Sequence, residues 1–120
     1  MPIIHVSVTG KQDVQKKRYF MEFAANSICS HTSTLPKNIY VYFHEMEPEN
    51  VRKTAPTVLI DWTMIPDRTN EAKKAIMGEL TDELAKMTGE NRSEIVIIFN
   101  DIPLPNAMLG GITRADNYNW

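Results

Sequence analysis

The chain has 120 residues, of which 42% are hydrophobic and 23% are charged, and its formal net charge is -2 at pH 7. This length suits one compact domain or two very small halves that share a core. The charge and the lack of a basic run argue against a nucleic-acid partner, and no apolar run is long enough for a membrane span. A single cysteine, Cys29, excludes an internal disulfide. With no secretory signal pattern, we expect a cytoplasmic protein.

The first half of the chain predicts a strand, a helix and a second strand. Residues 3–8 are apolar and mostly β-branched, which is typical of a buried strand. Asp13 is a good N-cap for a helix that continues to about Ser30. Residues 39–43 are aromatic and β-branched, and they predict the second strand. The helix has one face for the core, formed by residues spaced three and four apart: Phe20, Phe23, Ala24, Ser27 and Ile28.

The second half repeats this pattern. Residues 56–62 predict a strand, and Pro66-Asp67-Arg68 predicts a turn. Thr69 is the expected N-cap of a second helix, which Gly89 would terminate. Residues 94–99 predict the fourth strand. The second helix has its own core stripe, formed by Ala72, Ile76, Leu80, Leu84 and Met87.

The spacing indicates a duplication. Glu45 follows Asp13 at the same separation as Asp101 follows Thr69. We therefore predict an α/β fold of two tandem β-α-β units, with a four-stranded sheet and both helices on one face. Residues 1–55 form the first unit, residues 56–120 form the second unit and a C-terminal hairpin, and the two make one compact domain. Since the strands are apolar on both sides, we expect the open face of the sheet to be buried in an oligomer.

Four short motifs, in this order, resemble the tautomerase superfamily in its fused, two-unit form. They are Pro2-Ile3-Ile4-x-Val6, the turn and helix entry from Lys11 to Lys16, the pair Arg68-Thr69, and Leu109-Gly110-Gly111. The opening is similar to the 4-oxalocrotonate tautomerases, and the second half is similar to the cis-3-chloroacrylic acid dehalogenases. The resemblance covers nearly the whole chain, and its specificity lies in the order and spacing of the motifs.

The resemblance implies a homotrimeric isomerase that needs no cofactor or metal and acts on small 2-oxo, enol or dienol carboxylic acids. Removal of Met1 would make Pro2 the N-terminus, and its secondary amine would be the general base. Such a base needs a pKa near neutrality, which burial and neighbouring cations provide. Arg68 and Lys11 are the expected ligands of the substrate carboxylate, and Tyr40 could donate a hydrogen bond to a substrate oxygen.

Alternatives remain open at this stage. Tyr40 stands where the 4-oxalocrotonate tautomerases have an arginine, and Ile98 and Leu109 stand where the dehalogenases have their acid-base pair. These departures argue against hydrolytic dehalogenation. A decarboxylase, hydratase or dehalogenase of a 3-carbon acid, with Pro2 as an acid, remains an alternative, as does a non-catalytic assembly protein with this fold. Arg68, Lys11 and Tyr40 each also have a structural explanation, as solvated or packed side chains.

Overall fold

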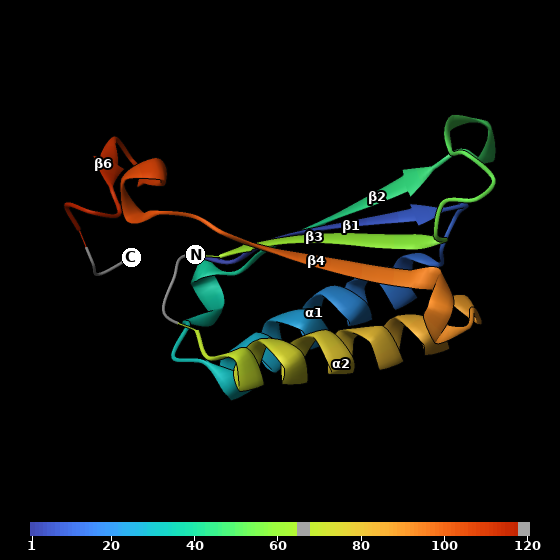
Figure 1. The fold of residues 1–120 in the computed structure, drawn as a ribbon, viewed down its shortest axis with the longest axis horizontal. Coiled ribbons are helices and arrows are strands. Elements are labelled where there is room, and N and C mark those ends of the chain that lie inside the picture. Colours follow the sequence, from blue (N-terminus) through green and yellow to red (C-terminus); the bar gives the residue numbers. More distant parts are fainter. Residues whose placement is uncertain (65–67, 118–120) are drawn as a thin grey trace.

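The computed structural model describes residues 1–64 and 68–117, and it confirms the predicted α/β fold (Figure 1). Two tandem β-α-β units form a four-stranded sheet with the order β2-β1-β3-β4, and both helices lie on one face of it. Pro66 and Asp67 of the predicted turn lie outside the described residues. The elements are β1 (Ile3–Thr9), α1 (Val14–His31), β2 (Tyr40–Met46), β3 (Val58–Met64), α2 (Asn70–Thr88), β4 (Ile95–Asp101), β5 (Met108–Leu109) and β6 (Ile112–Thr113).

The strand directions decide which loops meet. Within each unit the strands are parallel, and Ile3 pairs with Tyr40 while Val58 pairs with Ile95. The two units join through β1 and β3, which are antiparallel. The start of β1 therefore lies beside the end of β3. The N-terminus is thus at the same end of the sheet as the end of β3, which precedes α2.

Both helices begin at the residues that the sequence predicts. The Asp13 carboxylate accepts hydrogen bonds from the backbone N–H groups of Gln15 and Lys16, and the Thr69 hydroxyl accepts one from Ala72. These side chains satisfy N–H groups that have no partner inside the helix. Gly89 ends α2 with φ 72°, in the left-handed region that favours glycine.

The core lies between the two helices and the sheet face that they cover. Phe20 and Ile28 of α1, and Ile76 and Leu80 of α2, are at most 1% exposed. Alternate residues of the two central strands face them, because neighbouring side chains of a strand point to opposite faces. These strand residues are all fully buried: Ile4, Val6 and Val8 from β1, and Val58, Ile60, Trp62 and Met64 from β3.

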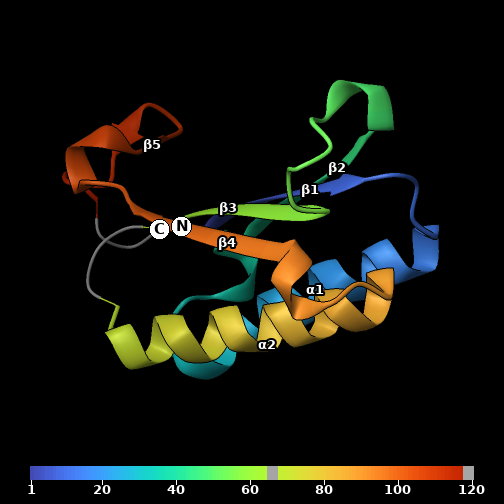
Figure 2. The same ribbon diagram turned by 45° about the vertical axis from the view of Figure 1, so that its right-hand side comes forward.

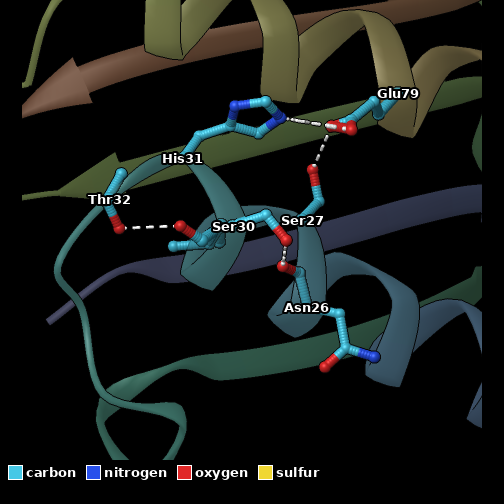
Figure 3. A network of polar contacts seen from close by, with 7 residues as sticks. Asn26, Ser27, Ser30, His31, Thr32 and Glu79 are labelled. Atoms are coloured by element: carbon cyan, nitrogen blue, oxygen red, sulfur yellow. Dashed lines mark hydrogen bonds and ion pairs between the residues drawn. The ribbon is translucent and has the colours of Figure 1, made fainter.

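A polar contact joins the two helices beside this core (Figure 3). The Ser27 hydroxyl donates a hydrogen bond of 2.9 Å to Glu79 Oε2, and His31 Nε2 lies 2.8 Å from the same oxygen. Ser27 is only 5% exposed, so its hydroxyl needs a partner, and Glu79 supplies one. This contact fixes the C-terminal half of α1 against α2.

The other face of the sheet carries no helix, and a short arm extends past the end of the sheet (Figures 1 and 2). Tyr42, Val96 and Ile98 on this face are 38–52% exposed. The arm contains β5 and β6, whose turn has two glycines with φ 60° and 84°, as a tight hairpin requires. Its apolar side chains Met108 and Ile112 are 60% and 49% exposed. No helix within the described ranges is long and apolar enough to cross a membrane.

Candidate active site

The N-terminal end of β1 carries the candidate site. Pro2 is buried immediately before β1, and its carbonyl oxygen accepts a hydrogen bond of 2.9 Å from the backbone N–H of Tyr40. This bond extends the pairing of β1 with β2 by one residue. The free amine of the chain is on Met1, one residue earlier, and in this form the Pro2 nitrogen belongs to a peptide bond.

The surroundings of the amine lower its pKa. Burial is the largest cause, followed by the positive charges of Arg114 and Arg68, and together they lower the pKa of the Met1 amine from 8.0 to about 6. Desolvation and a nearby cation both disfavour a protonated amine. The lowered pKa increases the unprotonated fraction of the amine near neutral pH, and an unprotonated amine can accept a proton.

Arg68 reaches this site from the segment that leads into α2. It directly precedes Thr69, the N-cap of α2, and it follows residues 65–67, which lie outside the described part of the chain. Its Nη2 donates a hydrogen bond of 3.2 Å to the hydroxyl oxygen of Thr34. Arg68 is thus a residue of the second unit that contacts Thr34 of the first unit. Its charge also helps to lower the pKa of the amine that precedes β1.

Arg114 is a second cation at the site, and the sequence analysis missed it. It follows β6 directly and is 9% exposed. Its backbone N–H donates to the carbonyl of Ala107 at 2.8 Å, and its Nη1 donates to the carbonyl of Asn117 at 3.0 Å. The only signal in the sequence was a cation just after the predicted Gly-Gly hairpin, and nothing there indicated that the hairpin returns it to the N-terminus.

The structure separates the other two predicted site residues. Tyr40 pairs with Ile3, so it lies beside the N-terminal end of β1. Lys11 follows Gly10 at the other end of β1, where the Gly10 N–H donates to the carbonyl of Met46. A seven-residue strand separates Lys11 from Pro2, a distance of about 20 Å. Within one chain, therefore, Lys11 is not brought to the amine.

The arrangement brings together a base and an anion-binding environment. An unprotonated amine can accept a proton, and the adjacent guanidinium groups can hold a carboxylate by paired hydrogen bonds. The same charges that lower the pKa of the amine would attract an acidic substrate to it. Within the described ranges, no three His, Cys, Asp or Glu side chains gather where they could hold a metal ion.

Comparison with known proteins identifies the family. The model of a family described as "Tautomerase enzyme" matches residues 56–116, which is half of the chain. The chain belongs to the tautomerase family. It is a fused-type member of the tautomerase superfamily, with two β-α-β units in one polypeptide. No curated protein sequence gives a match.

Solved structures with this tautomerase fold extend over nearly all of the chain. Pt0534, solved after inactivation by 2-oxo-3-pentynoate, is 22% identical, with a TM-score of 0.85 over 94% of this chain and 96% of that one. A native fused 4-OT is 16% identical, with a TM-score of 0.87 over 98% and 99% of the two chains. N1, a member of the cis-3-chloroacrylic acid dehalogenase family, is 17% identical, with a TM-score of 0.79 over 92% and 82%. At these identities the likeness establishes a shared fold.

Proposed function

We propose that this chain is a tautomerase of small 2-oxo, enol or dienol carboxylic acids, with Pro2 as the general base once Met1 has been removed. The observation that carries the proposal is the placement of the chain's amine, which is partly buried and lies near Arg114 and Arg68; these surroundings lower the pKa of the Met1 amine to about 6. With Met1 removed, the amine would be that of Pro2, one residue nearer to β1. Its neighbours would be the same segment of β2 and the same two arginines.

The proposed reaction moves one proton and needs no oxidant or reductant. The Pro2 nitrogen takes the proton from the enol hydroxyl, and the electron pair of that O–H bond becomes part of a new carbonyl. The C=C electron pair takes a proton at carbon, which the protonated Pro2 returns. Arg68 and Arg114 hold the substrate carboxylate and stabilise negative charge on the enol oxygen in the transition state.

The lowered pKa favours this base role over the alternative in which Pro2 acts as an acid. A decarboxylase or hydratase with a protonated Pro2 would need an amine that keeps its proton at neutral pH. Burial next to two guanidinium groups has the opposite effect on the amine. The pH dependence separates the two: activity of a base falls when the pH drops below the pKa of the amine, and activity of an acid falls when the pH rises above it.

Assembly into a homotrimer is part of the proposal. The open face of the sheet and the β5–β6 arm carry exposed apolar side chains, which a neighbouring copy of the chain would bury. Fused 4-OT structures of the same fold are described as symmetric and asymmetric trimers. In such an assembly, a Lys11 that contributes to substrate binding would come from another subunit. Within one chain, Lys11 and the N-terminal amine lie at opposite ends of β1.

The first experiment is an intact-mass measurement of the purified chain, which shows whether Met1 has been removed. The second is a ketonisation assay with phenylenolpyruvate and 2-hydroxymuconate as substrates. We expect turnover by the chain that begins at Pro2, and a strong reduction both in Pro2→Ala and in the chain that retains Met1, where the Pro2 nitrogen is part of a peptide bond. Absence of turnover by a verified Pro2 N-terminus would instead favour a non-catalytic assembly protein.

A covalent probe tests the base independently of turnover. Pt0534 is inactivated by 2-oxo-3-pentynoate, an alkynyl ketone that a neutral amine attacks by conjugate addition. The N–H bond adds across the triple bond, so nothing leaves and the protein gains the mass of the whole reagent. We expect one such addition per chain, at the N-terminal residue. Modification spread over lysine side chains, with the N-terminal peptide unmodified, would contradict the proposal.

A further inference from the structure

We propose that Thr34, supported by Thr32, is a positioning residue that holds Arg68 in the orientation needed for carboxylate binding. The inference rests on the proposed function, because it concerns the arginine of that same site. Its basis is a series of side-chain hydrogen bonds that begins at the end of α1, in the first unit. It ends at the Arg68 guanidinium, in the second unit.

The backbone around Thr34 is fixed from α1. The carbonyl oxygen of Thr34 accepts a hydrogen bond of 3.3 Å from the thiol of Cys29, and its N–H donates one of 3.2 Å to the Thr32 hydroxyl oxygen. Thr32 is the C-cap of α1, and its own N–H donates to the carbonyl of Ile28 at 3.0 Å. Thr34 therefore lies in a short, internally bonded extension of the helix.

The hydroxyl protons can be arranged in only one way that satisfies all the contacts. The Thr32 hydroxyl lies 2.7 Å from the Ile28 carbonyl oxygen, and the two threonine hydroxyls lie 2.9 Å apart. Each hydroxyl has one proton and can rotate it. If Thr32 donates to Ile28, which can only accept, then Thr34 donates to Thr32. A lone pair of the Thr34 oxygen then remains for the Arg68 N–H.

This direction of donation suits a cation. Arg68 can only donate hydrogen bonds, so a hydroxyl beside it must present a lone pair. The series begins at the Ile28 carbonyl oxygen, in the last turn of α1, where the helix dipole is negative. Each hydroxyl therefore donates its proton away from the guanidinium. This makes the Thr34 oxygen a stronger acceptor for the Arg68 N–H. The contact is also a long-range one, since it joins the C-terminus of α1 to the segment that precedes α2.

A positioning role matters most at this arginine. Arg68 lies directly before Thr69, the N-cap of α2, and outside the strands and helices of the fold. An arginine side chain has many rotamers, and a carboxylate is held by two parallel hydrogen bonds only when the guanidinium plane is correctly oriented. Contact with the Thr34 hydroxyl restricts this freedom before substrate arrives, which lowers the entropy lost on binding.

The test compares Thr34→Val, which removes the hydroxyl but keeps the shape, with Thr34→Ser, which keeps the hydroxyl. Thr81→Val is the matched control, since the Thr81 hydroxyl donates only to the carbonyl of Met77, within α2. We expect Thr34→Val to raise KM for a carboxylate substrate about tenfold, which corresponds to about 1.4 kcal/mol, with a smaller change in kcat. Thr34→Ser and Thr81→Val should remain close to the parent chain.

Two further measurements make the test decisive. In an Arg68→Ala background, Thr34→Val should have no further effect on KM, because the group that it positions is absent. NMR titration of the N-terminal amine should show its pKa rising in Thr34→Val, since a displaced guanidinium repels the proton less. An unchanged KM and amine pKa in Thr34→Val would overturn the inference, as would an equal effect with and without Arg68. If the parent chain has no turnover, the proposed function fails, while the titration still tests the role of Thr34.

Discussion

The ammonium nitrogen of Lys17 lies 2.5 Å from Glu45 Oε1, and this ion pair connects the first turn of α1 to the end of β2. The second unit has the equivalent pair, with Lys73 Nζ 4.0 Å from Asp101 Oδ1. Each lysine comes four residues after the N-cap of its helix. The duplication seen in the sequence spacing therefore extends to individual side-chain contacts.

Substitution Glu45→Gln should lower the free energy of unfolding at pH 7, and the deficit should shrink as the pH falls. Hydrogen bonds from the Lys17 side chain and the Gln12 backbone lower the pKa of the Glu45 carboxyl below its ordinary 4.5. A carboxyl with a lowered folded-state pKa contributes stability above its unfolded pKa and loses it as the pH falls through the folded value. Urea denaturation at pH 7 and at about pH 3, at one protein concentration, measures this.

The matched control for that prediction is Glu49→Gln. Glu49 is an exposed glutamate in the η2 turn (Pro48–Asn50), directly after the strand that carries Glu45. We expect little change in stability from it at either pH. A deficit in Glu45→Gln that was as large at about pH 3 as at pH 7 would show that packing, and not the charge of the carboxylate, explains its contribution.

Substitution Arg114→Gln should raise the pKa of the N-terminal amine part of the way from about 6 towards 8.0. Glutamine keeps much of the side-chain volume but removes the positive charge that disfavours the protonated amine. In an active chain that begins at Pro2, the acid limb of the pH–activity profile should move to higher pH, because the base becomes unprotonated only at a higher pH. NMR titration of the amine and the pH dependence of kcat/KM provide the two measurements.

Arg52→Gln is the control for this change, because it removes the same charge from an exposed position. Arg52 follows η2, at the end of the sheet opposite the N-terminus. It should leave both the amine pKa and the acid limb unchanged. Equal shifts in the two variants would mean that net charge, and not the proximity of Arg114, controls the amine.

The sequence predicted most of the fold because local signals and repeated spacing agreed with each other. Asp13 and Thr69 cap the helices as predicted, and the two stripes of apolar residues form the core. The predicted strands were placed correctly, but their ends differ by a few residues. The second strand continues to Met46, for example, because its pairing with β1 extends to Thr9. Tertiary pairing sets these ends, and local propensity does not encode it.

The candidate site was harder to predict because it depends on strand direction and on a distant segment. Lys11 and Arg68 occupy equivalent turns of the repeat, which suggested that both serve one site. Since β1 and β3 are antiparallel, equivalent turns lie at opposite ends of the sheet. Arg114 acts on the amine from near the other end of the chain, and its burial results from the hairpin fold. No local pattern around Arg114 indicates either property.

Substitution Leu80→Ala should destabilise the chain by about 2–5 kcal/mol. Leu80 is fully buried in α2, where it packs in the core beneath the sheet. Alanine has good helix propensity, so the loss would come from the lost burial and the cavity left behind. The measurement is urea denaturation at fixed protein concentration, with Val14→Ala, at a 53% exposed position of α1, as the control. A loss below about 1 kcal/mol would show that the core collapses around the smaller side chain.

Substitution Val96→Asp should weaken the proposed trimer without unfolding the chain. Val96 is on the open face of the sheet and is 38% exposed in the single chain, so a charge there is solvated in the monomer. In an assembly that covers this face, the same carboxylate would be buried without a partner, which is strongly unfavourable. Light scattering coupled to size-exclusion chromatography should show a shift from trimer to monomer, with the circular dichroism spectrum unchanged. Val14→Asp makes the same chemical change at the start of α1, on the helical side, and should remain trimeric. Dissociation of neither variant would place the interface away from Val96, and dissociation of both would mean that the effect is not specific to the open face.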